Sequence, residues 1–381
     1  MPVSRRRLLS AAVSAGVVHA AFPGWMSARG REAAQAAGST RAHASDVLPT
    51  LLLDSNENPT GACPAAVKAM AGLVKKASLY PYRDTRLLSD DIAARHDTRS
   101  DHVVTGCGST EILVNAVRAF TSPTAGLVTV VPTFETPARV ASTLGHPVVE
   151  RPLTKTLAID LDDLARHVPG AGLVFLCNPN NPTGTALSLE AVTAFVRETH
   201  KRSPDTVVLL DEAYIEYADG QGVASAEALA LTMPNVIVSR TFSKAFGMAG
   251  LRVGYALGHP DTLERMGPHG MPMSVNMFGL HAARSALADT TFEARERARN
   301  AEVRRFVTER FTAAGCRVAP SHTNFVMVDL GRDAASFRSA CTSGRVQVGR
   351  RFAPLDSHVR ISLGTMDEMR QAWSVFEPLL G

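Results

Sequence analysis

The sequence lacks the side-chain patterns that hold metal ions or disulfide frameworks. It has only five cysteines in 381 residues, with no C-x-x-C spacing, and its twelve histidines include no H-E-x-x-H pattern. An odd number of cysteines without that spacing argues against both a disulfide framework and a structural zinc site. We therefore predict no metal, and we expect the cysteines to be buried or loop thiols.

An excess of charge of one sign is also missing. The formal net charge is +4, and Lys and Arg are not concentrated on any segment beyond the first residues. A nucleic-acid partner therefore has no electrostatic support. Hydrophobic residues make up 45% of the chain and charged residues 20%, which is typical of a globular protein. At this length we expect one large α/β domain and a smaller companion domain.

Residues 1–44 have the three-part plan of an export signal. The paired arginines Arg5 and Arg6 precede an apolar, charge-free run over residues 8–22, and an Ala- and Gly-rich stretch follows. This resembles a twin-arginine signal peptide, with a mature chain that begins near Ser45. The apolar run is shorter than the ~20 residues of a membrane-spanning helix, so we expect no stable membrane anchor. The alternative is a cytoplasmic protein with an arginine-containing leader.

Beyond residue 50, short β-branched runs alternate with helical patterns. The expected strands are residues 126–131, 173–177, 206–210, 236–239 and 253–257. The expected helices are residues 111–120, 136–144 and 189–200; Ser109 and Thr110 suit the start of the first, and Ser188 suits the start of the third. Such alternation predicts a mostly parallel sheet, whose ligands bind beyond the carboxyl ends of the strands.

The pattern changes near residue 286. A long charged helix is expected over residues 291–314, followed by strands at 324–329 and 358–363. We therefore predict an N-terminal arm over 45–78, a large domain over 79–285 and a small domain over 286–381.

One lysine follows the expected strand 236–239. Lys244 lies near the hydroxyls of Thr241 and Ser243, and Arg252 follows eight residues later. A lysine after a strand is usually a solvated surface residue. With these neighbours it also suits imine chemistry, because nearby groups can lower the pKa of an amine, and hydroxyls with an arginine suit a phosphate monoester.

A carboxylate ends the expected strand 206–210. Asp211 would be costly to bury there without a cationic partner. An arginine in a structural ion pair would satisfy it, and so would a protonated pyridine nitrogen, which the carboxylate would keep charged. Tyr214, three residues on, could then donate a hydrogen bond to a phenolic oxygen on the same ring.

Two further segments follow expected strands. Asn181 lies in a loop with two Asn-Pro pairs and a glycine, where it could bind the same phenolic oxygen, although turn formation alone explains most such loops. Gly108, Ser109 and Thr110 open the helix over 111–120, where backbone N–H groups could meet an anion. A simple capping turn is the alternative for that segment.

Together these segments resemble fold-type I pyridoxal-phosphate enzymes, and most closely the histidinol-phosphate aminotransferase branch of the class I/II aminotransferases. The matching segments are residues 53–59, 80–81, 106–113, 132–134, 181–184, 211–214, 241–254, 321–325 and 359–365. They span essentially all of the chain after the signal. The resemblance implies a three-layer large domain with a mostly parallel sheet that carries the cofactor, and a smaller α+β domain.

The resemblance also implies roles for single residues. Lys244 would hold pyridoxal 5'-phosphate as an imine and shuttle a proton, while Asp211 would pair with the pyridine nitrogen. The residues expected to bind the cofactor are Lys244, Gly108, Ser109, Thr110, Phe134, Asn181, Asp211, Tyr214, Thr241, Ser243, Arg252 and Tyr80. Because Tyr80 would reach the phosphate in the neighbouring subunit, the resemblance implies a homodimer. The expected substrate contacts are Arg360, Arg350, Asn58 and Asn324, with Arg351 as an alternative to Arg350.

The expected activity is transfer of an amino group between an amino acid, or a histidinol-phosphate-like amine, and a 2-oxoacid. The branch often has a second aromatic residue where this sequence has Pro137, so the substrate itself is left open. One alternative is a decarboxylase of a phosphorylated amino acid that uses the same cofactor. Another is a non-catalytic, aminotransferase-like ligand sensor, which would need a DNA-binding module that the first residues do not resemble.

Overall fold

The computed structural model describes residues 50–219 and 222–381. The predicted signal, residues 1–44, lies outside the described residues. Within these ranges, no helix is both long enough and apolar enough to cross a membrane.

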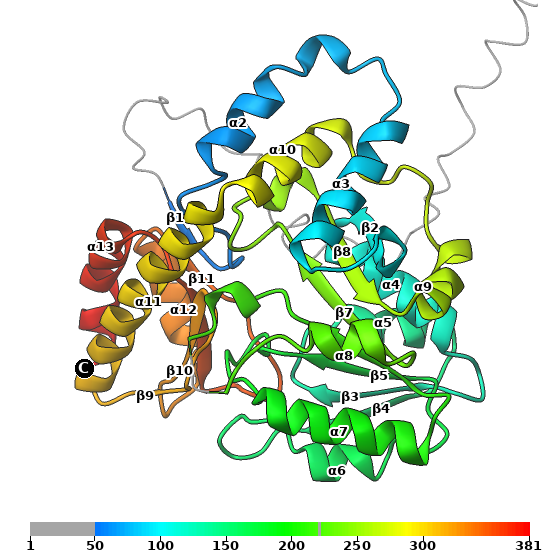
Figure 1. The fold of residues 1–381 in the computed structure, drawn as a ribbon. Helices are drawn as coiled ribbons and strands as arrows, with labels where there is room; N and C mark the ends of the chain where they lie inside the picture. Colours follow the sequence, from blue (N-terminus) through cyan, green and yellow to red (C-terminus); the bar gives the residue numbers. More distant parts are fainter. Residues whose placement is uncertain (1–49, 220–221) are drawn as a thin grey trace, which may run out of the picture. The chain divides into compact units, whose positions relative to one another are not determined.

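A seven-stranded sheet organises most of the described chain (Figure 1). In spatial order its strands are β2 (Val103–Cys107), β8 (Val253–Gly258), β7 (Val236–Thr241), β6 (Val207–Asp211), β5 (Leu173–Cys177), β3 (Leu127–Val131) and β4 (Val148–Pro152). Only β8 runs antiparallel to its two neighbours. The predicted, mostly parallel sheet is therefore confirmed, and each predicted strand of this sheet lies within one residue of its expected position at the start. Strands β2 and β4 were not among the predicted strands.

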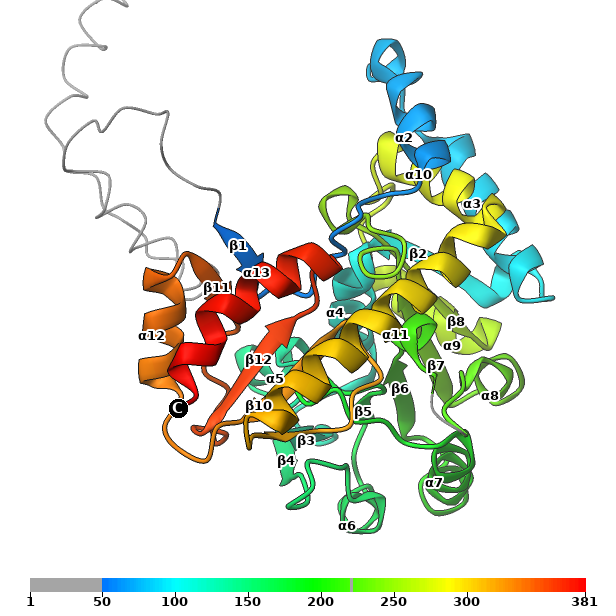
Figure 2. The ribbon, with the colours of Figure 1, turned by 90° about the vertical axis from the view of Figure 1, so that its left-hand side faces the viewer.

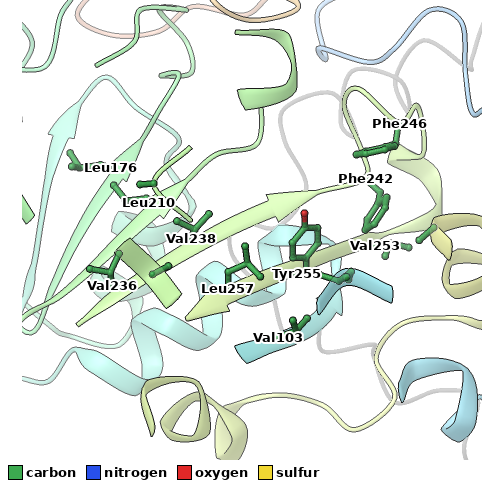
Figure 3. Close-up of a cluster of buried hydrophobic side chains, with 14 of the residues drawn as sticks. Val103, Leu176, Leu210, Val236, Val238, Phe242, Phe246, Val253, Tyr255 and Leu257 are labelled. Atoms are coloured by element: carbon green, nitrogen blue, oxygen red, sulfur yellow. The ribbon is translucent and has the colours of Figure 1, made fainter. Parts of the chain in front are cut away.

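Side chains alternate between two hydrophobic cores, one on each face of this sheet. On β6, Val208 and Leu210 belong to one core, and Val207 and Leu209 to the other. Figure 3 shows Leu210 in the first core beside side chains of the neighbouring strands. Because every second residue of a strand faces the same side, a strand buried on both faces reads as a continuous apolar run.

Helices cover both cores, which makes the three layers. Helices of the first core are α3 (Tyr82–Arg95), α7 (Leu189–Arg202), α8 (Glu227–Thr232) and α10 (Met277–Ala288). Helices of the second are α4 (Gly108–Phe120), α5 (Thr136–Thr143) and α9 (Pro260–Met266). Two further helices are α2 (Pro64–Ala71), which packs on α10, and α6 (Leu161–Ala165). The predicted three-layer α/β class is confirmed.

A third hydrophobic core belongs to smaller sheets and three helices (Figure 2). One sheet has the order β12 (His358–Ser362), β10 (Phe325–Asp329) and β9 (Arg317–Val318); the other pairs β1 (Leu51–Leu53) with β11 (Val346–Val348). The helices are α11 (Thr290–Ala313), α12 (Ala335–Ser343) and α13 (Met366–Phe376). This is the predicted α+β part. The division at residues 78 and 285 stays a prediction, and residue 285 lies within α10.

One helix start differs from the sequence prediction. Helix α4 begins at Gly108, not at residue 111, and no side chain caps it. Ser109 and Thr110 therefore lie in its first turn and do not cap it. The predicted cap of α7 is confirmed, because the hydroxyl of Ser188 accepts a hydrogen bond from the backbone of Ala191.

Candidate active site

The predicted site residues are gathered by the topology of the seven-stranded sheet. The carboxyl ends of β2, β5, β6 and β7 lie at one edge, because these strands run in the same direction. Strand β8 runs the other way, so it begins at that edge, directly after Arg252. The ends of parallel strands thus bring together segments that are more than a hundred residues apart in the sequence.

Asp211, the last residue of β6, is 3% exposed. Its Oδ1 atom has no hydrogen-bond partner among the described residues. Burial raises the pKa of this carboxyl group to about 7, against the smaller opposing effect of the nearby Ser239 hydroxyl, which itself has no hydrogen-bond partner among the described residues. A buried carboxylate is costly without a cation, so this position suits a positively charged ligand group.

Lys244 follows β7 at the same edge of the sheet. Its Nζ atom donates to the backbone oxygens of Asn56 at 2.9 Å and of Ser55 at 3.3 Å. Burial lowers the pKa of this amine to about 8, and the positive charge of Arg360 lowers it further, while Asp211 acts in the opposite direction. A much larger fraction of this amine than of an ordinary lysine is therefore neutral, and nucleophilic, near physiological pH.

The ring of Tyr214 faces the Nζ atom of Lys244. Its hydroxyl oxygen accepts hydrogen bonds from the amide of Asn56 at 3.1 Å and from that of Asn181 at 3.3 Å. The Nζ atom of Lys244 is 5.7 Å from the centre of the Tyr214 ring, whose edge packs against Phe325. Burial raises the pKa of this phenol. The predicted trio of Lys244, Tyr214 and Asn181 therefore lies together.

Two glycines allow other groups to approach the start of α4 closely. Gly108 has φ +72°, and a Cβ atom there would lie 2.4 Å from a terminal nitrogen of Arg252. A Cβ atom on Gly254 would lie 2.2 Å from the backbone nitrogen of Ser109. The uncapped helix start thus faces a guanidinium group, and both attract an anion such as a phosphate.

Four more predicted cofactor contacts lie at or shortly after strand ends or in the first turn of α4, and Phe134 among them was expected to stack on the ring of the cofactor. Thr241 and Ser243 are buried, and the hydroxyl of Thr241 accepts a hydrogen bond from the backbone of Ser243 at 3.1 Å. Thr110 is half-buried in the first turn of α4. Phe134, half-buried between β3 and α5, packs against the core beneath that helix. Their cofactor contacts stay predictions.

Arg360, on β12, brings a second cation to the site. One of its terminal nitrogens donates to the Oδ1 atom of Asn181 at 2.6 Å, and the other to the backbone oxygen of Asp54 at 2.6 Å. Burial lowers the pKa of this guanidinium to about 10, and nearby Arg350 lowers it further. Because both Asn181 and Tyr214 are within its network, this arginine lies beside the predicted catalytic groups.

Arg350 and Arg351 have different partners. Arg350 is more than half exposed and pairs with Glu135 at 2.6 Å, next to Phe134. Arg351 pairs with Asp356 at 2.5 Å. The guanidinium groups of Arg350 and Arg360 lie 4.4 and 4.8 Å from the centre of the Phe352 ring, and this nearness to Arg360 favours Arg350 over Arg351 for the predicted substrate contact.

Asn58 and Asn324 are predicted substrate contacts that bind the main chain here. The amide of Asn58 donates to the backbone oxygen of Ala245 at 3.0 Å. The amide of Asn324 donates to the backbone oxygens of Asn56 and Glu57. In this arrangement both side chains hold the segment around Asn56 against the site, and a contact with substrate stays a prediction.

Tyr80 lies apart from the other predicted residues. It is 76% exposed, and its ring lies 5.8 Å from that of Tyr82. In the described part of the chain, no hydrogen bond or ring contact joins it to another predicted site residue. This agrees with a role that needs a second subunit, which stays a prediction.

Sequence reasoning missed two residues of this network, Asn56 and Ser362. Both are buried, and each occurs within a segment that carries the family resemblance. Asn56 has φ +54°, a conformation that asparagine adopts more readily than most residues. In the sequence, only the presence of an asparagine in a turn-like segment could have pointed to Asn56. That signal does not show which groups the side chain binds.

Comparison with known proteins identifies the family. Residues 49–376 match the model of the class I and II aminotransferases. The chain belongs to this family, which confirms the predicted resemblance and the predicted transaminase class.

Individual relatives agree. The chain is 34% identical over 334 residues to a histidinol-phosphate aminotransferase of Anaeromyxobacter, which covers 86% of this chain and 90% of that protein. The crystal structure of the histidinol-phosphate aminotransferase from Sinorhizobium meliloti, in complex with pyridoxal-5'-phosphate, is 26% identical with a TM-score of 0.81, and the match covers 90% of this chain and 99% of that one. The L-threonine-O-3-phosphate decarboxylase from Porphyromonas gingivalis shares the fold, with a TM-score of 0.75 at 22% identity over 87% of this chain and 99% of that one.

Proposed function

We propose that this aminotransferase moves an amino group from a phosphate- or carboxylate-bearing amine, such as a histidinol-phosphate-like amine, to a 2-oxoacid. One observation carries the proposal: a buried carboxylate without a cation, Asp211, lies at the same sheet edge as an amine of lowered pKa, Lys244. An acid that needs a cation and an amine that is easily made neutral are the two groups required for imine chemistry on a protonated pyridine.

The cofactor is pyridoxal 5'-phosphate, and the residues present fit it. Asp211 would face the pyridine nitrogen with its unpartnered oxygen. The cradle formed by Gly108, the start of α4 and Arg252 would hold the phosphate. When bound, the cofactor supplies an electron sink and a carrier for the amino group.

Lys244 holds and moves the proton in this proposal. Its Nζ atom is held by two backbone oxygens. Because its pKa is lowered to about 8, it can both take up and return a proton near neutral pH. Tyr214 and Asn181 would bind the phenolic oxygen of the cofactor, and Phe134 would cover the ring. The burial of Asp211 and Tyr214 excludes water from this side of the site.

Arg360 sets the substrate class. A guanidinium with two terminal nitrogens suits bidentate binding of a carboxylate or phosphate. The relatives described above are histidinol-phosphate aminotransferases, which supports a phosphorylated amine as donor. No observation in the described residues specifically favours decarboxylation, and the likeness to the decarboxylase concerns the fold alone.

A half-reaction screen tests the substrate. The purified, cofactor-loaded enzyme is mixed with histidinol phosphate, an aromatic amino acid or an acidic amino acid, without an acceptor. We expect histidinol phosphate to shift the cofactor absorbance from the aldehyde to the amine form at the lowest concentration. A preference for an acidic or aromatic donor would contradict the donor class and leave the transaminase intact. Release of carbon dioxide would instead support the decarboxylase.

We also propose that the active unit is a homodimer. Exposed apolar side chains gather on the segment that holds Tyr80. They are Val67, Val74, Leu79, Tyr80 and Tyr82. A patch of this kind commonly marks a protein interface. Mixing Tyr80→Ala with Lys244→Ala chains tests it: if Tyr80 serves the neighbouring subunit, mixed dimers recover one intact site that neither parent has. Sedimentation as a monomer would rule the dimer out.

Export by the twin-arginine signal is a third proposal, and it concerns residues outside the described ranges. It is supported by Arg5 and Arg6 ahead of an apolar run. Replacing both with lysine should keep the protein in the cytosol, whereas the matched change of Arg29 and Arg31 to lysine should not. Equal fractionation of the two variants would favour the cytoplasmic alternative.

A further inference from the structure

Two amide side chains converge on the hydroxyl oxygen of Tyr214, and the structure shows which way each amide points. Asn181 offers its Oδ1 atom to Arg360 at 2.6 Å, because a guanidinium can only donate. Its nitrogen is therefore the atom that faces Tyr214, at 3.3 Å.

Asn56 is oriented by Ser362. The hydroxyl of Ser362 accepts a hydrogen bond from the backbone nitrogen of Asn56 at 2.8 Å, so its own proton is free to go to the Oδ1 atom of Asn56, 2.9 Å away. That leaves the side-chain nitrogen of Asn56 facing Tyr214 at 3.1 Å. Asn56, Ser362 and Tyr214 are all less than 4% exposed, so water does not compete for these bonds.

Both orienting groups come from one strand. Arg360 and Ser362 are alternate residues of β12, so they project from the same face. Arg360 fixes the amide of Asn181 and Ser362 fixes that of Asn56. Strand β12 thus orients both of the amides that bind the hydroxyl oxygen of Tyr214.

The consequence concerns the proton of Tyr214. An amide nitrogen donates and does not accept, so the phenol oxygen is the acceptor in both bonds. None of the described residues accepts the O–H of Tyr214 in return. We propose that Asn56 and Ser362 are positioning residues that oblige Tyr214 to donate its proton into the site, to the phenolic oxygen of the cofactor. This inference rests on the proposed function.

The test is a pH titration of the visible absorbance of the Lys244-linked cofactor in the full chain. A donor to the phenolic oxygen stabilises negative charge there, so losing it strengthens the hold on the proton shared with the lysine nitrogen. Tyr214→Phe should therefore raise the midpoint, by about one to two pH units for a hydrogen bond to a charged group.

Asn56→Asp tests the proposed direction of the hydrogen bond most directly, because it replaces the donating nitrogen with an accepting oxygen at almost unchanged shape. The Tyr214 proton should turn to the new carboxylate, and the midpoint should rise as in Tyr214→Phe. Ser55→Asp adds the same charge one residue away on an exposed side chain, and it should shift the midpoint less. In a Tyr214→Phe background, Asn56→Asp should add no more than Ser55→Asp does.

Two substitutions at Ser362 test the proposal independently of Asn56. Ser362→Ala should raise the midpoint, whereas Ser362→Thr, which keeps the hydroxyl, should restore it. A midpoint unchanged by Ser362→Ala, or an effect of Asn56→Asp equal to that of Ser55→Asp, would overturn the proposal. If instead the unaltered chain shows no absorbance band that depends on Lys244, the proposed function itself fails.

Discussion

Asp211 and Glu212 are consecutive buried carboxylates at the end of β6, and they meet opposite surroundings. Glu212 is fully engaged: it pairs with Arg240 at 2.9 Å and accepts hydrogen bonds from Ser225 and the backbone of Ala226, both at 2.7 Å. Asp211 has an oxygen with no partner among the described residues. Two acids that are nearly equal in burial therefore differ in whether the fold itself satisfies them.

The cluster around Arg240 shows what a structural ion network looks like in this protein. Arg240 also pairs with Glu216 at 3.1 Å and with Glu227 at 3.2 Å, and Glu227 in turn pairs with His96 at 2.9 Å. Each charge there meets a protein partner. In the candidate site, by contrast, Asp211, Lys244 and Arg360 meet mostly neutral groups. Charges that the fold buries without pairing are the ones available to a ligand.

The largest effect expected from this comparison is at Lys244. Lys244→Ala should lower the turnover rate by about 10⁴-fold, the upper range for a positioned acid–base group. It should also abolish the borohydride-sensitive visible band. Folding should be retained, because the hydrogen bonds that the amine makes within the described residues go to backbone oxygens. An unchanged spectrum in this variant would refute the role of the lysine.

Asp211→Asn and Glu212→Gln are a matched pair that tests the contrast directly. Glu212→Gln should lower the free energy of unfolding by about 2–3 kcal/mol, because a buried charged partner of Arg240 is lost. Asp211→Asn should not destabilise the cofactor-free chain, yet it should cost most of the activity. Chemical denaturation of both variants without cofactor measures this. Equal destabilisation would show that the two acids are alike.

The raised pKa of Asp211 fixes how the stability of the cofactor-free chain should depend on pH. The folded pKa of Asp211, about 7, exceeds its ordinary value of 3.8, so the folded chain binds this proton more tightly than the unfolded chain does. The cost of the carboxylate therefore grows as the pH rises from about 4 to about 7 and is complete above that, at roughly 4 kcal/mol. Asp211→Asn should gain stability over the unaltered cofactor-free chain across this window. A constant difference would contradict the raised pKa.

Three arginines should give graded, smaller effects. Arg360→Met should lower kcat/KM roughly 100-fold, because a buried charge-assisted contact is lost. Arg350→Met should lower it roughly threefold, as expected of an exposed charge. Arg351→Met, which removes a pair with Asp356, should leave it unchanged. A larger loss at Arg351 than at Arg350 would reverse our choice between them.

Much of the site could be predicted because it follows strands of one sheet. Asp211, Asn181 and Lys244 each come shortly after an apolar run, and parallel strands bring such positions to one edge. Arg252 could be linked to a phosphate only through its nearness to Lys244 in the sequence and through the resemblance. It precedes a strand, and it reaches this edge because β8 is antiparallel, which the alternation of helices and strands did not reveal.

The start of α4 was also predicted wrongly from the sequence. Ser109 and Thr110 are good capping residues, so capping preferences placed the helix start after them. Gly108 instead begins the helix with a positive φ, next to Arg252. Arg252 is distant in the sequence, so preferences that depend on neighbouring residues could not include its close approach to Gly108.

The sequence alone determined which segments are strands, which turns follow them and which residue types can carry the chemistry. These depend on neighbours along the chain, and periodicity and turn residues report them. The tertiary structure alone decided that Asp211 is unpaired while Glu212 is paired, and which way the proton of Tyr214 points. Those depend on Arg240, Asn56, Arg360 and Ser362, which are separated in the chain by up to 306 residues and meet only after folding.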